Sequence, residues 1–143
     1  MARYIYSKVD PSKLLHIINR LEDITKERKD IIPADNFLNI SSFILPKDKT
    51  FIPHKHLWHK DTIHGDMKIA NESWCIINGS VLATLYDIDN VIVEEVILKQ
   101  GDFSWSSGEG GHNYKSLEEN TVVYEFKTAP YFGREIDKEA LSG

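Results

Sequence analysis

Apolar residues near the start of the chain recur at helical spacing. They follow Asp10-Pro11, a pair that suits the first positions of a helix. The recurring residues are Leu14, Leu15, Ile17, Ile18, Leu21 and Ile24. Polar and charged residues occupy most of the positions between them. The pattern predicts an amphipathic helix over residues 11–28 that packs on a barrel wall or on a partner subunit.

Beyond a loop that contains Pro33, the apolar pattern changes from helical to alternating. Alternation predicts strands with one buried face, separated by turns rich in Gly, Asn and Asp. The expected strands are 37–45, 50–57, 72–77, 80–87, 91–98, 103–106, 112–116 and 121–128. Short strands with a turn roughly every 8 to 12 residues are typical of a β-barrel or jelly roll.

The turn residues add predictions about pairing. Asn78-Gly79 is the strongest hairpin signal in the chain, because both central positions of a type I′ turn need positive φ. We therefore expect the strands on either side of it to form a hairpin. The strands 112–116 and 121–128 are expected to form the last hairpin. Residues 58–71 show no period and are expected to be irregular, and a short polar helix is expected over 135–141.

Length and composition describe an ordinary globular protein. The 143 residues suit a single domain, with 41% hydrophobic and 27% charged residues. No apolar run approaches the roughly 18 to 20 residues that span a bilayer, and the first residues lack the apolar core of a secretory signal. We therefore expect a cytoplasmic protein. Its net charge of -5, without a cluster of Lys and Arg, argues against nucleic acid as a partner.

The cysteine content restricts the metal chemistry. Cys75 is the only cysteine, so the chain has no internal disulfide and no multi-cysteine zinc cluster. Cys75 also has the opposite strand parity from Glu72, and it is expected to be an inert buried thiol. A metal ion in this protein would be held by nitrogen and oxygen atoms.

Three histidines and a glutamate are the candidate ligands. His54 and His56 lie two apart on an expected strand, so their side chains project from the same face. Imidazole is available as a neutral ligand near pH 7. Glu72 begins one expected strand, and His112 begins another after the glycine-rich loop 107–111. Closure of the sheet can bring the four side chains to one mouth of the barrel.

These residues carry a family resemblance. His-x-His at 54–56, Glu-x6-Gly at 72–79 and Gly-Asp-x9-His at 101–112 resemble the two signature motifs of the cupin superfamily. The resemblance covers about residues 50–128. It implies a cupin-like jelly-roll barrel with one divalent metal ion held by His54, His56, Glu72 and His112. It also implies that Gly79 and Gly101 are turn glycines.

The end of the chain resembles a subgroup of that superfamily. Residues 123–131 and 137–139 are similar to the close of small WbuC-type cupin-fold metalloproteins. Those proteins are associated with surface-polysaccharide gene clusters. The resemblance implies an isomerase or epimerase that acts on a sugar or nucleotide-sugar. An iron-dependent dioxygenase and a non-catalytic small-ligand-binding module remain the alternatives.

Two departures from the cupin pattern leave the ligand set open. Fifteen residues, 57–71, separate the His-x-His pair from Glu72, where three or four are usual. Four residues of this insertion can replace Glu72 as a ligand: His59, Asp61, His64 and Asp66. In the second motif, Ser107 and Glu109 stand at the usual proline and glycine positions. A degenerate cupin, with histidines that only fill the barrel, is the other interpretation.

The residues near the expected ligands supply candidates for proton transfer. Strand parity puts Trp74 on the face of Glu72 and Tyr114 on the face of His112. The candidate catalytic residues are Glu109, Tyr114 and Glu125. Glu125 shares a face with Lys127, although such a pair on an outer strand is more often a surface pair.

The ligand types leave the ion undetermined. Imidazole and carboxylate suit iron(II), manganese, nickel or zinc. One such ion and a small-molecule ligand are the expected partners. The resemblance also implies a homodimer, because cupins of this size commonly pack barrel against barrel. The expected helix would cover part of the dimer interface.

Overall fold

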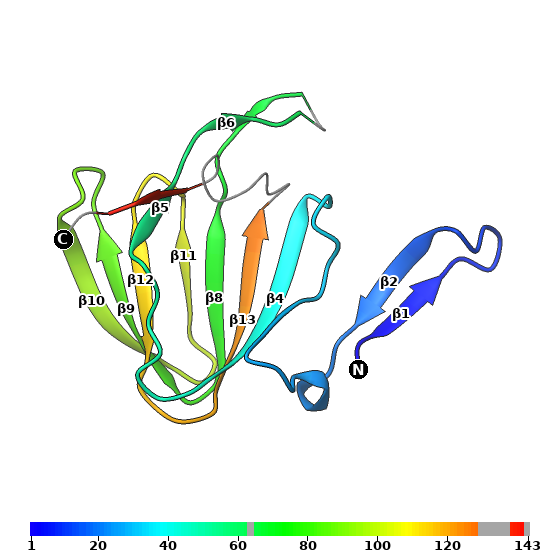
Figure 1. The fold of residues 1–143 in the computed structure, drawn as a ribbon, viewed down its shortest axis with the longest axis horizontal. Helices are drawn as coiled ribbons and strands as arrows, with labels where there is room; N and C mark the ends of the chain where they lie inside the picture. The colour runs from blue at the N-terminus through cyan, green and yellow to red at the C-terminus, as the bar shows by residue number, and fades with distance from the viewer. Residues whose placement is uncertain (63–64, 129–137, 142–143) are drawn as a thin grey trace.

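Two five-stranded antiparallel sheets pack around one hydrophobic core and form the barrel (Figure 1). The computed structural model describes residues 1–62, 65–128 and 138–141. The first sheet contains, in spatial order, β10 (Ile92–Lys99), β9 (Ser80–Tyr86), β12 (His112–Ser116), β5 (His54–His56) and β14 (Lys138–Ala140). The second contains β11 (Phe103–Ser106), β8 (Glu72–Asn78), β13 (Thr121–Thr128), β4 (Leu38–Leu45) and β3 (Arg28–Asp30).

Burial alternates along the strands that form the core. Along β8, Glu72, Trp74 and Ile76 are buried, and the residues between them are half-buried. The core takes side chains from both sheets: Phe43, Leu45, Trp74, Ile76, Val81, Ala83, Leu98, Tyr114 and Val123. Each of the eight expected strands overlaps an observed one. The prediction of a jelly-roll-like β fold is therefore confirmed.

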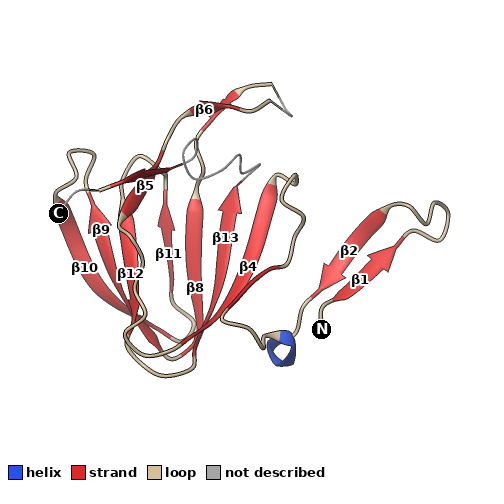
Figure 2. Ribbon diagram, viewed as in Figure 1, coloured by secondary structure: helices blue, strands red, loops and turns tan. Residues whose placement is uncertain are grey.

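The predicted helix over residues 11–28 is wrong. Residues Leu14–Ile18 form β2, which pairs antiparallel with β1 (Arg3–Tyr6). In the described part of the chain, the helical structure is limited to the 3-10 turn η1 (Leu21–Asp23) (Figure 2). The apolar spacing is helical, but a cross-strand partner decides the conformation. Tyr4 faces Ile17 across the ladder, an aromatic and β-branched pair that favours a sheet.

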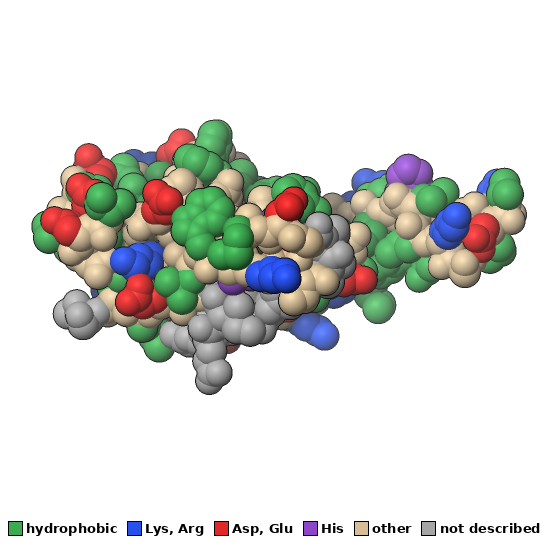
Figure 3. All heavy atoms as spheres, turned by 90° about the horizontal axis from the view of Figure 1, so that it is seen from above, with side chains coloured by type: hydrophobic (Ala, Val, Ile, Leu, Met, Phe, Trp, Pro, Cys, Tyr) green, Lys and Arg blue, Asp and Glu red, His purple; other side chains and the backbone are tan. Residues whose placement is uncertain are grey.

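The β1–β2 hairpin, called the arm below, extends away from the barrel (Figures 1 and 3). Its link to the barrel includes a hydrogen bond of 2.9 Å from Asn19 Nδ2 to the hydroxyl of Tyr124. An ion pair between the Met1 amino group and Asp23 connects the residue before β1 to η1, which follows the arm. Its solvent-exposed side chains include Tyr6, Val9 and Leu15.

Two predicted hairpins are also wrong. The strands on either side of Asn78-Gly79 are β8 and β9, and they belong to different sheets. Gly79 has a φ of 82°, whereas Asn78 is not among the residues with positive φ. A Cβ at Gly79 would lie 2.6 Å from Thr121 Oγ1, so glycine permits a tight turn that carries the chain from one sheet to the other. Strands β12 and β13 likewise separate into different sheets.

The remaining expectations concern the insertion and the tail. Residues 58–71 are not wholly irregular, because β6 (His59–Lys60) pairs with β7 (Met67–Lys68). The polar helix expected over 135–141 is wrong where it can be compared: residues Lys138–Ala140 form β14 beside β5. Residues 135–137 lie outside the described part.

None of the described helical segments has the length and apolarity needed to cross a membrane.

Candidate metal centre

The four candidate ligands come from three strands that meet at one end of the barrel. His54 and His56 lie on β5, and His112 faces His54 across the β12–β5 pair. Glu72 is the first residue of β8, in the opposite sheet. The structure brings one ligand atom of each of these four side chains within 4.8 Å of the others. His56, Glu72 and His112 are buried, and His54 is half-buried.

The donor atoms converge closely enough to share one cation. The Nε2 atoms of His54 and His112 are 3.2 Å apart. The carboxylate of Glu72 forms an ion pair with Nε2 of His112 and lies 4.0 Å from Nε2 of His56. Four electron-rich atoms at this separation repel one another unless a proton or a cation lies among them. The site therefore has the donor chemistry of a mononuclear metal centre.

Hydrogen bonds on the far side of the rings support this assignment. Nδ1 of His54 is 2.9 Å from the carbonyl oxygen of Ile52. A carbonyl only accepts, so Nδ1 of His54 carries the proton and its Nε2 presents a lone pair to the cluster. Nδ1 of His112 is 3.1 Å from Ser106 Oγ, which holds that ring in place. Metal-binding histidines are oriented by such partners.

The surroundings shift the pKa values of two of the candidate ligands, His54 and Glu72. Burial and the neighbouring charge of His112 lower the pKa of His54 to about 4, so this ring is neutral at pH 7. Burial alone would raise the pKa of Glu72. The charge of His112 and its hydrogen bond to Glu72 outweigh burial and hold the pKa of Glu72 well below its usual range. Glu72 is therefore ionised.

The glycine-rich loop fixes the backbone around the cluster. The carbonyl oxygen of Gly108 accepts a 2.9 Å hydrogen bond from the backbone N–H of His56. Gly108 has a φ of 100°, and a Cβ there would collide with the carbonyl oxygen of Ala70. The loop thus holds β5 close to the chain that leads into β8.

A cavity of about 50 Å³ adjoins the cluster. Its lining includes Trp74 and Tyr114, as strand parity predicts. The rings of these two residues stack with centroids 4.1 Å apart, and the Tyr114 hydroxyl lies 2.7 Å from Ser104 Oγ. Burial raises the pKa of Tyr114 far above its ordinary value, so the phenol stays protonated.

Glu125 is buried, whereas the sequence predicted that it lies on the surface. Glu125 and Lys127 are each only 7% exposed, so they are not a surface pair. The carboxylate of Glu125 lines the cavity and accepts a 3.0 Å hydrogen bond from the indole N–H of Trp74. Burial and the charge of Glu72 raise the pKa of Glu125 above its ordinary value. A carboxyl group with a raised pKa suits proton transfer near neutral pH.

Glu109 and the insertion lie outside this cavity. Glu109 is exposed and accepts a hydrogen bond of 3.1 Å from the indole N–H of Trp58. Together they line a separate open hollow on the outer side of His56. Among the described residues of the insertion, His59, Asp61 and Asp66 do not belong to the four-residue cluster. His64 lies outside the described residues.

Cys75 was expected to be a buried thiol, but the structure leaves it half-buried.

Sequence patterns did not identify two residues that line the cavity. Arg28 lies on β3, within the expected helix, and Lys138 lies on β14, within the expected tail. Both reach the cavity only because these strands add to the outer edges of the two sheets. Pairing of distant segments leaves no local signal, so no sequence pattern pointed to them.

Comparison with solved structures identifies the fold. The cupin domain of Cnp3 from Schizosaccharomyces pombe matches with a TM-score of 0.61 and 11% identity, over 90% of this chain and 83% of that one. The fold is that of a cupin. The KdgF structure from Halomonas sp. matches this cupin fold with a TM-score of 0.56 and 16% identity, over 76% of this chain and 81% of that one.

A larger protein contains the same cupin fold. CapF, solved with the inhibitor 3-isopropenyl-tropolone, matches with a TM-score of 0.62 and 14% identity. The match covers 81% of this chain but 31% of CapF. No protein-family model matches the sequence, and no curated protein is significantly similar to it. The likeness is thus one of fold, with a cluster in this chain that can hold a metal ion.

Proposed function

We propose that this protein binds one divalent iron, manganese, nickel or zinc ion and moves a proton on a small polar substrate. The substrate class is a sugar or a nucleotide-sugar, and the reaction is an isomerisation or epimerisation. The observation that supports this most directly is the convergence of three imidazoles and a carboxylate beside a buried glutamate. The fold shared with KdgF and CapF is consistent with the proposal.

The residues have distinct roles in this proposal. His54, His56, Glu72 and His112 would hold the ion, which would polarise a carbonyl or hydroxyl oxygen of the substrate. Glu125 takes or returns the proton, because it lines the cavity and burial raises its pKa above the ordinary value. Tyr114, which stays protonated, donates a hydrogen bond inside the cavity. Trp74 holds the carboxylate of Glu125 in position through its indole N–H.

Solvent exchange tests the proton transfer. We expect metal-loaded protein to exchange hydrogen next to the carbonyl of a suitable aldose or ketose with deuterium, as followed by ¹H NMR. Glu125→Gln should slow this exchange roughly 100-fold, the usual contribution of a general acid or base, with unchanged metal content. Glu109→Gln is the matched control and should leave the rate unchanged, because Glu109 lies outside the cavity.

Other outcomes would identify another function. Oxygen consumption that requires iron, without hydrogen exchange, would favour the dioxygenase. Saturable binding without turnover of any sugar would favour a ligand-binding module. An active Glu125→Gln variant would remove Glu125 from the mechanism.

We also propose that the protein acts as a homodimer. A two-stranded hairpin alone is marginally stable in water, and the arm exposes apolar side chains. Residues 1–20 carry four Lys or Arg and one Asp. The edge of the first sheet is complementary, because residues 87–98 carry four Asp or Glu and no Lys or Arg. Ile92, Val93 and Ile97 are exposed on that edge strand. An arm packed on the edge strand of a second copy would bury both surfaces.

Substitutions in the arm test this assembly. Replacing both Tyr6 and Leu15 with Glu should weaken dimerisation at least about tenfold, because buried apolar contacts are lost. Light scattering after size-exclusion chromatography measures the change in mass. Met67→Glu, on β7, is an exposed control at 60% and should leave the mass unchanged. A wild-type protein that remains monomeric at all concentrations would rule out the dimer.

A further inference from the structure

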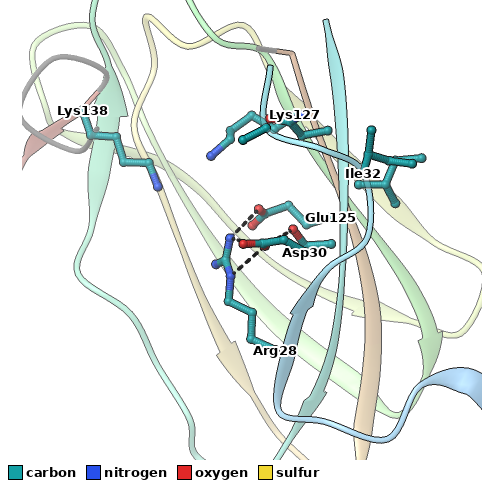
Figure 4. Close-up of a pocket in the computed structure, with 10 residues that line it drawn as sticks. Arg28, Asp30, Ile32, Glu125, Lys127 and Lys138 are labelled. Carbon is teal, nitrogen blue, oxygen red and sulfur yellow. Dashed lines mark hydrogen bonds and ion pairs between the residues drawn. The ribbon is translucent and has the colours of Figure 1, made fainter. Parts of the chain in front are cut away.

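A second, larger pocket adjoins the metal cavity (Figure 4). Its volume is about 240 Å³. Arg28, Glu125 and Lys138 line both this pocket and the cavity beside the four candidate ligands. The pocket is lined by residues of β3, β4, β13 and β14, and β3 and β14 are edge strands of the two sheets. A molecule in the pocket can therefore extend toward the candidate metal centre.

The pocket is basic in a protein that is acidic overall. Its charged lining consists of three cationic side chains and two carboxylates: Arg28, Lys127, Lys138, Asp30 and Glu125. The whole chain has a net charge of -5. Figure 4 shows the side chains of Lys127 and Lys138 pointing into the pocket from opposite sides, with Arg28 below them. Lys127 is only 7% exposed, so its position in the pocket is set by the fold.

The two carboxylates of the pocket already have partners. Asp30 Oδ1 accepts hydrogen bonds from Ser41 Oγ at 2.7 Å and from Arg28 Nε at 3.2 Å. Glu125 accepts from Trp74 and lies 3.8 Å from Arg28 Nη2. These contacts hold the guanidinium against one wall. Both carboxylates are thus engaged at that wall, on the opposite side of the pocket from Lys138 (Figure 4).

Two of the three cationic side chains also lie at the metal cluster. Arg28 and Lys138 line the pocket and, together with His54, Glu72 and His112, the smaller cavity. An anion held by them would therefore lie next to the candidate metal centre.

We propose that Arg28, Lys127 and Lys138 form a subsite for an oxyanion of the substrate, a carboxylate or a phosphate. The inference rests on the proposed function, since it adds a substrate class to the same site. Arg and Lys donors form charge-assisted hydrogen bonds with such groups. Pockets for drug-sized ligands have roughly 300 to 1,000 Å³, so this smaller one suits an acidic or phosphorylated monosaccharide better than a nucleotide-sugar.

Calorimetric titration of chelator-treated protein at low salt tests the subsite without any metal. The probes are glucuronate, glucose 6-phosphate and glucose, which share a sugar ring and differ in charge. We expect at least one of the two anions to bind tenfold or more tightly than glucose. Binding of only one anion identifies the subsite as a carboxylate site or a phosphate site.

Variants assign the effect to the pocket. Lys138→Gln and Lys127→Met should each weaken anion binding about tenfold or more, the usual effect of losing a hydrogen bond to a charged group. Lys60→Gln, on the exposed insertion, is the charge-matched control and should bind as the wild type does. Lys138 is on an edge strand, so its variant carries the test if the buried Lys127→Met fails to fold.

Two results would overturn the subsite. One is equal affinity for glucose and both anions, and the other is unchanged anion affinity in folded Lys138→Gln. The proposed function fails separately. Protein that binds glucuronate but neither retains metal nor exchanges hydrogen would support the subsite and contradict the proposed reaction. Hydrogen exchange on neutral sugars, without preference for anions, would support the proposed reaction and contradict the subsite.

Discussion

Zinc, manganese, nickel or iron(II), added to chelator-treated protein at about 100 times its dissociation constant, is expected to raise the melting temperature by roughly 5 to 10 °C. Binding to the folded state alone stabilises it by about 2.7 kcal/mol at that concentration, and a domain of this size gains a few degrees per kcal/mol. Elemental analysis of the same samples should find one ion per chain. The four convergent donors are the physical reason.

Loss of a ligand should abolish this stabilisation. His112→Ala removes the imidazole paired with Glu72, so it also leaves a buried carboxylate and destabilises the metal-free protein by about 3 to 5 kcal/mol. His54→Ala is the gentler variant, because His54 is half-buried. Each should weaken metal binding more than 100-fold, beyond the 10- to 100-fold typical of residues that only orient a ligand.

Exposed acidic residues provide the control for ligand loss. Glu109→Gln should retain the full shift in melting temperature, since Glu109 is not part of the cluster. A folded His54→Ala variant that binds each metal as the wild type does would contradict the assignment. So would a wild-type protein that melts at one temperature with and without all four ions.

Trp74→Ala is expected to lower the free energy of unfolding by about 3 to 5 kcal/mol, the usual cost of removing a buried aromatic side chain. Trp74 is 2% exposed and stacks on both Phe43 and Tyr114, with centroids 5.3 and 4.1 Å away. Its loss also removes the indole donor to Glu125. Urea denaturation followed by circular dichroism measures the change.

Two tryptophan variants separate packing from hydrogen bonding. Trp105→Ala should change stability by less than about 0.5 kcal/mol, because Trp105 is 60% exposed. Trp74→Phe keeps a ring but removes the donor, and it should cost about 1 to 3 kcal/mol by leaving Glu125 without that hydrogen bond. Equal stability of the Trp74→Ala and Trp105→Ala variants would contradict the structure of the core.

Strand positions followed from the sequence because alternation is a local property. The strand expected over 121–128 is β13 (Thr121–Thr128), although its buried face carries Glu125 and Lys127 while Val122, Tyr124 and Phe126 are half-buried. Pairing is not local. Gly79 was correctly expected to need positive φ, but nothing near it shows that β8 and β9 enter different sheets. Residues Leu14–Ile18 have helical spacing and still form a strand, because β1 supplies hydrogen bonds that a local pattern does not reveal.

The site was predictable to the same extent. The resemblance to the cupin motifs implied the set His54, His56, Glu72 and His112, and the structure brings these four together. Strand parity placed Trp74 and Tyr114 beside them. Strand parity shows which residues of a strand share a face, but it does not show which face other strands cover. Glu125 and Lys127 therefore looked like a surface pair, whereas β3 and β14 enclose them in a pocket. Arg28 and Lys138 lie on those two edge strands, so their place in the pocket could be identified only from the structure.

The four donors are divided between the layers of the barrel. The three imidazoles belong to the sheet that contains β5 and β12, and the carboxylate of Glu72 belongs to the sheet that contains β8. An ion held by all four would cross-link the layers at one rim. Without the ion, the ion pair between Glu72 and His112 joins the two layers at this rim. Binding of the ion would add two further imidazoles to that junction, so occupancy would set how firmly the layers are held together there.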